Sequence, residues 1–371
     1  MRLALVIADP YLPDVVAGGI LDLHHLAHQL LRQGHEVEVV AARYGGRRLV
    51  LHRQLQRLAP HHPFARTDEV NGYPTVRVGP WAIEQYVEQR LDAGGWDAVV
   101  LQGAPALDML AAVRRARVPA LLRVVAMSEV DEMARRGATD PAFAALLADP
   151  LVRVVSNSYF VAGALAAVGL DSPVCYPVVD LDACMSTTST PRYVTMVNPR
   201  GVKGLDIALA VAELLPHRQF LLQEAWALAP AERSELLDRI AGMPHVRLAP
   251  VTDDMATVYG RTALLLAPSQ CVETFGRVAL EAAANGVPVV ASDSGGLPEA
   301  VGDAGVLVDP NAPAADWAEA VERVLADPDV RAAYGRRGVA HAGSPGFAAA
   351  DVAAQFAGLA QDMLAGPPAV R

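Results

Sequence analysis

The segment ALLLAPSQCVETFGRVALEAAANGVPVVASDSGGLPE, residues 263–299, contains two strand patterns with a helix pattern between them. The runs ALLLAP and VPVVAS are continuously apolar, which is typical of parallel strands that are covered on both faces. The helix pattern begins near Gly276 and ends at Gly286, with Pro288 just beyond it. The loops that follow these strands lie where open α/β sheets bind ligands. The segment therefore predicts a strand–helix–strand unit with a ligand site at one edge of the sheet.

The same alternation extends along the chain on both sides of this segment. Further strand patterns are LALVIA, HEVEVVAA and DAVVLQ in the first half, and YVTMVN, QFLLQ and VRLAP in the second. The stretches between them are rich in alanine, leucine and arginine and are typical of helices. The small polar stretch STTSTP, residues 186–191, predicts a linker. The sequence thus predicts an α/β protein of two Rossmann-like domains, residues 1–185 and 192–345.

Length and composition limit the class of protein. A chain of 371 residues exceeds the usual single core, which favours two domains. The net charge of −10 is spread over the chain without a basic patch, which argues against nucleic acid and anionic membranes as partners. The cysteines Cys175, Cys184 and Cys271 form no C-x-x-C pair, so we expect reduced thiols in a cytoplasmic protein. The apolar run at the start of the chain stops at Asp9, which indicates a buried strand rather than a signal peptide or membrane span.

Several residues of the first quoted segment have the chemistry of a nucleotide site. A helix that begins at Gly276 would present backbone N–H groups with partial positive charge, which suits a diphosphate. Glu281 lies a little over one turn further and could accept two hydrogen bonds from a ribose diol. Glu273 lies in the preceding loop, nearer the reacting end, and Gly295 and Gly296 open the next helix. The alternatives are a solvated surface residue for Glu281, a charge at a helix N-terminus favoured by the helix dipole for Glu273, and a simple turn for the glycine pair.

The stretch VNPRGVKGLD, residues 197–206, contains Lys203, the single lysine among 31 basic residues. A lysine ammonium is a compact charge with three rotating donors and fits between two phosphates, whereas arginine is a bulkier planar fork. We interpret Lys203 as a phosphate ligand at a helix start. Chance retention in a chain that strongly prefers arginine is the alternative.

Glu273-x7-Glu281 followed by GVPVVASDSGGLPE resembles the retaining glycosyltransferase family 4, which has the GT-B fold. The resemblance covers the whole chain and implies two Rossmann-like domains that face a central cleft. It implies that Glu281 binds the donor ribose, Glu273 contacts the donor sugar, Lys203 neutralises the diphosphate, and no metal is needed. It also implies that the last helix, about residues 348–364 with the tail to residue 371, packs back on the first domain. The residues expected to bind the donor are Gly18, Gly19, Asn198, Arg200, Lys203, Glu273, Phe275, Gly276, Glu281, Gly295 and Gly296.

Two positions depart from the family pattern. Asn198 stands where many relatives have an arginine five residues before the lysine, and Arg200 in the same loop is the candidate substitute. The strand and loop LLRVVAMSEVDEM, residues 121–133, lack the histidine that relatives often have there. Ser128 and Glu129 are the candidates for an acceptor-side polar contact or base. His24 with His28, and Asp180 with Asp182, have spacings found in metal sites, but neither pair belongs to a complete motif, so we expect no metal.

The predicted function is retaining transfer of a sugar from a nucleotide-diphosphate sugar to a hydroxyl acceptor by a front-face mechanism. The resemblance favours a UDP-sugar such as UDP-GlcNAc or UDP-glucose as donor, with Lys203, Glu273, Ser128 and Glu129 as the candidate catalytic residues. We expect no cofactor, no nucleic-acid partner and no stable membrane insertion, and we expect the domains to close about residues 186–191. The alternatives are a GT-B nucleotide-sugar epimerase and a non-catalytic nucleotide-sugar binding protein.

Overall fold

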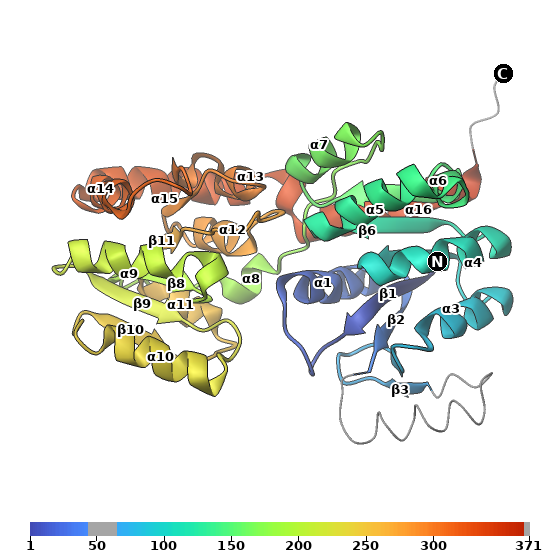
Figure 1. The fold of residues 1–371 in the computed structure, drawn as a ribbon, viewed down its shortest axis with the longest axis horizontal. Helices are drawn as coiled ribbons and strands as arrows, with labels where there is room; N and C mark the ends of the chain where they lie inside the picture. The colour runs from blue at the N-terminus through green and yellow to red at the C-terminus, as the bar shows by residue number, and fades with distance from the viewer. Residues whose placement is uncertain (44–64, 367–371) are drawn as a thin grey trace. The chain divides into compact units, whose positions relative to one another are not determined.

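The structure is a computed structural model that describes residues 1–43 and 65–366 and divides into two compact units (Figure 1). Unit 1 comprises Met1–Val178 and Ala348–Arg371, and unit 2 comprises Val179–Phe347. Each unit is built on a largely parallel sheet with helices between the strands, so the predicted α/β architecture is confirmed. In the described part of the chain, no helix combines the length and the apolar character that crossing a membrane would require.

The sheet of unit 1 has the strand order β3-β4-β2-β1-β5-β6-β7. Neighbouring strands are parallel except β3 and β4, which pair antiparallel. The strands are β1 (Arg2–Pro10), β2 (Glu36–Ala42), β3 (Arg66–Asp68), β4 (Thr75–Val78), β5 (Ala98–Gln102), β6 (Ala120–Val124) and β7 (Val152–Ser156). The central strands β5 and β6 are buried throughout, and β1 is buried from Leu3 to Ile7, because helices cover both faces of the sheet there.

The helices of unit 1 are α1 (Gly18–Arg32), α3 (Ile83–Asp92), α4 (Leu110–Ala116), α5 (Met127–Thr139), α6 (Pro141–Leu147), α7 (Tyr159–Ala167) and α16 (Ala349–Ala365), with a 3-10 helix at Ala104–Met109. One core joins the sheet to α1 and α16 through side chains such as Leu23 and Phe356. A second core joins the other face to α3, α4 and α5. Figure 1 shows α16 in red alongside β6, and α16 also contacts α1. The last helix therefore belongs to unit 1 although it follows unit 2 in the sequence.

The sheet of unit 2 has the order β10-β9-β8-β11-β12-β13, and all its neighbouring strands are parallel. The strands are β8 (Tyr193–Val197), β9 (Gln219–Gln223), β10 (Val246–Ala249), β11 (Thr262–Ala267), β12 (Val289–Ser292) and β13 (Gly305–Val308). The strand order proceeds to one side from β8 and to the other side from β11. The loops that follow β8 and β11 therefore part at a topological switch point, where doubly wound sheets bind ligands.

The helices of unit 2 connect these strands and end with the segment that returns to unit 1. They are α8 (Leu181–Cys184), α9 (Leu205–Leu214), α10 (Pro230–Ile240), α11 (Met255–Arg261), α12 (Arg277–Ala284), α13 (Leu297–Val301), α14 (Ala314–Leu325) and α15 (Pro328–Ala342), with 3-10 helices at Gly201–Lys203, Gly302–Ala304 and Pro345–Phe347. The main core packs α9 and α14 against the sheet around the fully buried Trp317.

The segment 186–191, predicted as a linker, is hydrogen-bonded to other residues of unit 2. The Asn285 side chain donates to the Cys184 carbonyl at 3.0 Å and accepts from the Ser186 N–H at 2.8 Å. The Thr190 N–H donates to the Gly260 carbonyl at 2.7 Å. These bonds hold the segment on α11 and α12, and the two units divide ahead of it, between Val178 and Val179.

Candidate functional site

The two loops at the switch point of unit 2 bring Lys203 and Glu273 together. The Lys203 ammonium lies 2.5 Å from Oε1 of Glu273, and the Ser269 hydroxyl donates to the same oxygen at 2.9 Å. The side chains of Lys203 and Glu273 are 27% and 22% exposed, so both remain accessible to a ligand. The two residues that the sequence analysis selected in separate segments thus form one ion pair at the ligand-binding edge of the sheet.

Direct backbone contact holds these two loops against each other. The Val202 carbonyl accepts from the N–H groups of Gln270 and Cys271, both at 3.0 Å. Gly204 has φ +84°, and a β-carbon there would overlap the carbonyl of Pro268. Only glycine satisfies both conditions, because other residues rarely adopt that φ and would carry the clashing atom. Gly204 therefore fixes the position of the lysine loop relative to the glutamate loop, a role that the sequence analysis did not assign.

Gly295 and Gly296 pack against the backbone of the glutamate loop. The Gly296 N–H donates to the Glu273 carbonyl at 2.7 Å. A β-carbon on Gly295 would clash with the Glu273 carbonyl, and one on Gly296 would clash with the Thr274 carbonyl. The pair thus supports the loop that carries Glu273 by close backbone approach, and its predicted contact with the donor stays a prediction.

Gly276 is the N-cap of helix α12, whose first backbone N–H groups lie at the same edge of the sheet. Gly276 has φ +105°, and a β-carbon there would lie 2.5 Å from the side chain of Leu297. The preceding Phe275 is buried, with its ring centroid 5.9 Å from that of Phe347. The buried ring anchors the helix start, whose partial positive charge suits an anionic ligand.

Glu281 lies one turn into α12 and has two protein partners. The Tyr259 hydroxyl donates to Oε2 at 2.8 Å, and the Arg277 guanidinium lies 3.6 Å from Oε1. The Glu281 side chain is 14% exposed, whereas Tyr259 is fully buried. Burial, followed by the charge of Glu281, raises the pKa of Tyr259 well above its ordinary value. Tyr259 had no signal in the sequence analysis, because its role depends on the contact of α11 with α12. Arg277, which the sequence analysis missed, lies four residues before Glu281 on the same helix, and this spacing was a signal for a pair.

Asn198, at the position of the missing arginine, and Arg200, its candidate substitute, lie in different environments. Asn198 directly follows β8 with φ +62°, is 5% exposed, and has no hydrogen-bond partner for either side-chain amide atom. Arg200 donates to the Ala227 carbonyl at 3.1 Å, lies 3.5 Å from Glu232, and sits over the Trp226 ring. The guanidinium of Arg200 therefore contacts the loop after β9 in this structure, and its predicted phosphate contact stays a prediction.

In unit 1, Gly18 and Gly19 begin α1, and a buried polar network fixes this helix start. The Gly19 carbonyl accepts from the Gln102 side chain at 3.0 Å, and Gln102 accepts from Arg123 at 3.1 Å. Arg123 also forms a buried ion pair with Asp22, whose other oxygen accepts from the Val178 N–H at 2.7 Å. The sequence analysis missed this network, although Arg123 inside the apolar run ALLRVVA was a signal that a buried charge needs a partner.

Glu129, a candidate base, caps the helix that contains it. Its Oε2 accepts from the N–H groups of Val125 and Ala126 at 2.6 and 3.0 Å, at the start of α5. It is 5% exposed, and burial raises the pKa of its carboxyl group although the backbone N–H bonds oppose that shift. Its position accounts for a structural role and leaves little access for an acceptor. Ser128, the other candidate, is exposed at the same helix start.

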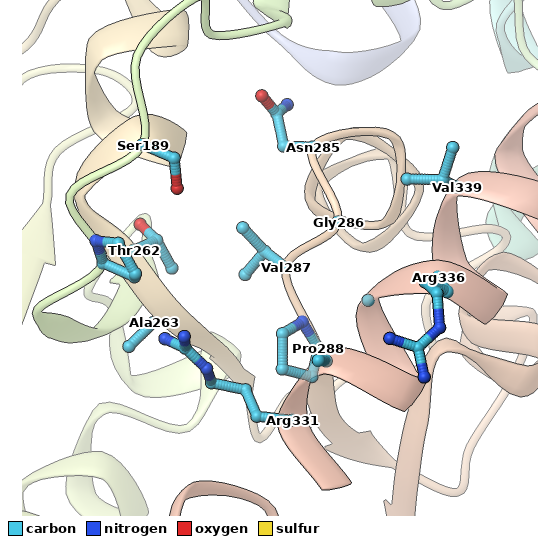
Figure 2. Close-up of a pocket in the computed structure, with 13 residues that line it drawn as sticks. Ser189, Thr262, Ala263, Asn285, Gly286, Val287, Pro288, Arg331, Arg336 and Val339 are labelled. Carbon is cyan, nitrogen blue, oxygen red and sulfur yellow. The ribbon is translucent and has the colours of Figure 1, made fainter. Parts of the chain in front are cut away.

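A separate cavity of about 420 Å³ lies where the strands of the unit 2 sheet begin, at the end away from Lys203 and Glu273 (Figure 2). Its lining includes Thr262 and Val287, which precede or begin the strands, and Arg331 and Arg336 from α15. It contains none of the residues predicted to bind the donor.

Among the described residues, no three His, Cys, Asp or Glu side chains are grouped as a metal site would require.

Residues 193–327 match the family model for glycosyl transferases group 1. D-inositol 3-phosphate glycosyltransferase from Segniliparus rotundus is 43% identical to this chain over 157 residues, which cover 38% of this chain and 34% of that protein. The enzyme of the same name from Corynebacterium kroppenstedtii is 39% identical over 146 residues, covering 38% and 32%. The chain therefore spans about a third of the length of these curated relatives.

Solved structures resemble the chain over nearly its whole length. Sucrose-phosphate synthase from Thermosynechococcus elongatus has a TM-score of 0.76 at 20% identity, covering 99% of this chain and 100% of the other. Alr3699/HepE from Anabaena, in complex with UDP and glucose, has a TM-score of 0.72 at 20% identity, covering 96% and 98%. At such identities the likeness concerns the fold alone.

Proposed function

Because the chain has the GT-B fold and its residues 193–327 belong to the glycosyl transferases group 1 family, we propose that the protein is a glycosyltransferase that uses a nucleotide-diphosphate sugar. The observation that carries this proposal is the ion pair of Lys203 and Glu273 at the switch point of unit 2. It combines a cation suited to a diphosphate with a carboxylate suited to sugar hydroxyls, beside the start of α12.

The proposed reaction is a front-face transfer with retention. The bond between the anomeric carbon and the diphosphate oxygen breaks, and the acceptor oxygen bonds to that carbon on the same face. The acceptor proton passes to the departing diphosphate. Lys203 and the first N–H groups of α12 stabilise the negative charge that develops on the leaving group, and Glu273 accepts hydrogen bonds from the donor sugar.

The identities of the donor sugar and of the acceptor are the more specific parts of the proposal. A UDP-sugar such as UDP-glucose or UDP-GlcNAc is the first donor to test, since HepE, which shares the fold, was solved with UDP-glucose. The relatives named above act on D-inositol 3-phosphate, which makes an inositol phosphate the first acceptor to test. The family match lies in unit 2, whereas the acceptor is expected on unit 1, so other hydroxyl acceptors belong in the same screen.

The proposal is tested by incubating the protein with UDP-glucose or UDP-GlcNAc, with and without D-inositol 3-phosphate, in the presence of EDTA. We expect acceptor-dependent release of UDP and a product whose anomeric coupling, measured by NMR, matches an α-linked donor. Donor conversion without acceptor would instead identify an epimerase, and donor binding without any turnover a binding protein. A β-linked product would refute the front-face mechanism, and activity restored only by magnesium or manganese would refute the metal-free site.

A further inference from the structure

The carboxylate of Glu281 is held between a neutral donor and a cation. Tyr259 donates its hydroxyl to Oε2 at 2.8 Å, a length typical of a good hydrogen bond. Arg277 lies 3.6 Å from Oε1, close enough for attraction but beyond hydrogen-bond distance. An ionised carboxylate has about four acceptor positions, and Tyr259 occupies one of them. The remaining positions are enough to receive both hydroxyls of a ribose.

Tyr259 is a donor of fixed orientation. It lies on α11 and is 1% exposed, and the Val278 carbonyl, at 3.5 Å, is a second and more distant acceptor for its hydroxyl. A buried aromatic ring has little freedom to turn its hydroxyl elsewhere, because protein cores are close-packed. The direction in which Glu281 presents its free lone pairs is therefore set by a side chain that lies below the surface.

Loss of the tyrosine hydroxyl would favour the other partner of the carboxylate. Arg277 is four residues before Glu281 on the same helix, and such a pair can close to a bidentate ion pair. A carboxylate drawn into that geometry uses both oxygens on the guanidinium. About two acceptor positions then remain, and the guanidinium rather than the tyrosine sets their direction, although no ligand contact has been deleted directly.

We propose that Tyr259 is a positioning residue that orients Glu281 toward a ribose diol, in competition with Arg277. This inference rests on the proposed function, because it assumes that the ligand of α12 is a nucleotide. It assigns to the chain a preference for ribonucleotides over 2′-deoxyribonucleotides that depends on a residue outside the ligand contact surface.

The test uses Tyr259→Phe and isothermal titration calorimetry with UDP, 2′-deoxy-UDP and pyrophosphate. We expect the Kd for UDP to rise roughly tenfold in the variant, since a hydrogen bond to a charged group is lost. The Kd for pyrophosphate should stay within about twofold, because that ligand has no ribose. The preference of the wild type for UDP over 2′-deoxy-UDP should largely disappear.

Two further variants separate positioning from a general loss of structure. The double variant Tyr259→Phe/Arg277→Met removes the competing cation and should recover part of the UDP affinity lost in Tyr259→Phe, measured against Arg277→Met alone. Tyr193→Phe is the matched control: it removes another buried hydroxyl of unit 2, one that accepts from Arg261 at 3.3 Å, and should leave all three Kd values unchanged.

Three results would overturn the inference: equal loss of UDP and pyrophosphate binding in Tyr259→Phe, survival of the ribose preference, or no recovery in the double variant. Failure of the proposed function would be visible in the wild-type measurement alone. In that case the wild-type protein would bind neither UDP nor ADP nor GDP, before any variant is compared.

Discussion

Glu273→Gln tests whether the Lys203 ammonium binds a diphosphate. In the structure this ammonium is neutralised by Glu273 at 2.5 Å. The substitution removes the negative charge and keeps the size of the side chain. A diphosphate would then meet an unneutralised cation and no nearby carboxylate, so we expect tighter binding of UDP, although the sugar loses an acceptor.

The magnitude follows from the exposure of the pair. Surface ion pairs are worth about 0.2–1 kcal/mol, and breaking deeply buried pairs costs about 3–5 kcal/mol. Lys203 and Glu273 are 27% and 22% exposed, which places them nearer the surface class than the buried one. We therefore expect about 1 kcal/mol of additional binding free energy, which is roughly a fivefold lower Kd for UDP.

Calorimetry with UDP measures this change, and a steady-state assay with the intact donor should show lower turnover in the same variant. Glu322→Gln is the matched control, because it breaks another ion pair of unit 2, in which Arg218 and Glu322 lie 2.8 Å apart. The side chains of this pair are 28% and 31% exposed, and neither residue lies in the two site loops. The Kd of this variant for UDP should equal that of the wild type. Weaker or unchanged UDP binding in Glu273→Gln would refute the view that Lys203 faces the phosphates.

Substitutions at three further positions test the site loops of unit 2 and the buried network of unit 1. Lys203→Ala should raise the Kd for UDP by about tenfold or more, since a charge-assisted contact contributes about 1.5–3 kcal/mol, and Lys203→Arg should recover only part; an arginine variant equal to wild type would favour chance retention of the lysine. Gly296→Ala should lower turnover at least roughly tenfold with the circular dichroism spectrum unchanged, because its β-carbon displaces the Thr274 carbonyl; full activity would contradict this role. Arg123→Met should lower the free energy of unfolding of unit 1 by about 3–5 kcal/mol in urea titrations, because it leaves the Asp22 carboxylate buried without its cation. A loss below about 1 kcal/mol would contradict this.

The sequence analysis could predict the fold because the relevant signals are local. Continuous apolar runs mark buried parallel strands wherever they occur, and each depends on fewer than ten residues of sequence. Residues 263–299 also predicted a site loop, and the structure has Glu273 and Lys203 in contact, as neighbouring strand ends require. Segments adjacent in a parallel sheet bring their following loops together whatever lies between them in the chain.

The parts that the sequence could not predict depend on pairs distant in the chain. Asp22 and Arg123 are 101 residues apart, and Tyr259 and Glu281 are 22 apart, so no periodicity relates them. The capping role of Glu129 could have been predicted locally, because a carboxylate three residues after the N-cap is a common cap. The sequence analysis considered Glu129 only as a catalytic base or polar contact and missed this role. The hydrogen bonds that residues 186–191 make to α11 and α12 also join distant parts of the chain, and the role of this segment as a linker stays a prediction.

The site of unit 2 depends on backbone contact more than on side-chain packing. Gly204 meets Pro268, Gly295 meets Glu273, and Gly296 meets Thr274, each too closely for a β-carbon. Backbone contacts of this kind cannot be adjusted by a change of rotamer, so the lysine loop, the glutamate loop and the start of α13 form one rigid group. The distance between Lys203 and Glu273 is then a property of the fold rather than of the two side chains alone. A diphosphate that replaces Glu273 beside the ammonium meets a lysine loop whose backbone position is already fixed, and a preorganised charge of this kind stabilises a leaving group with the least reorganisation.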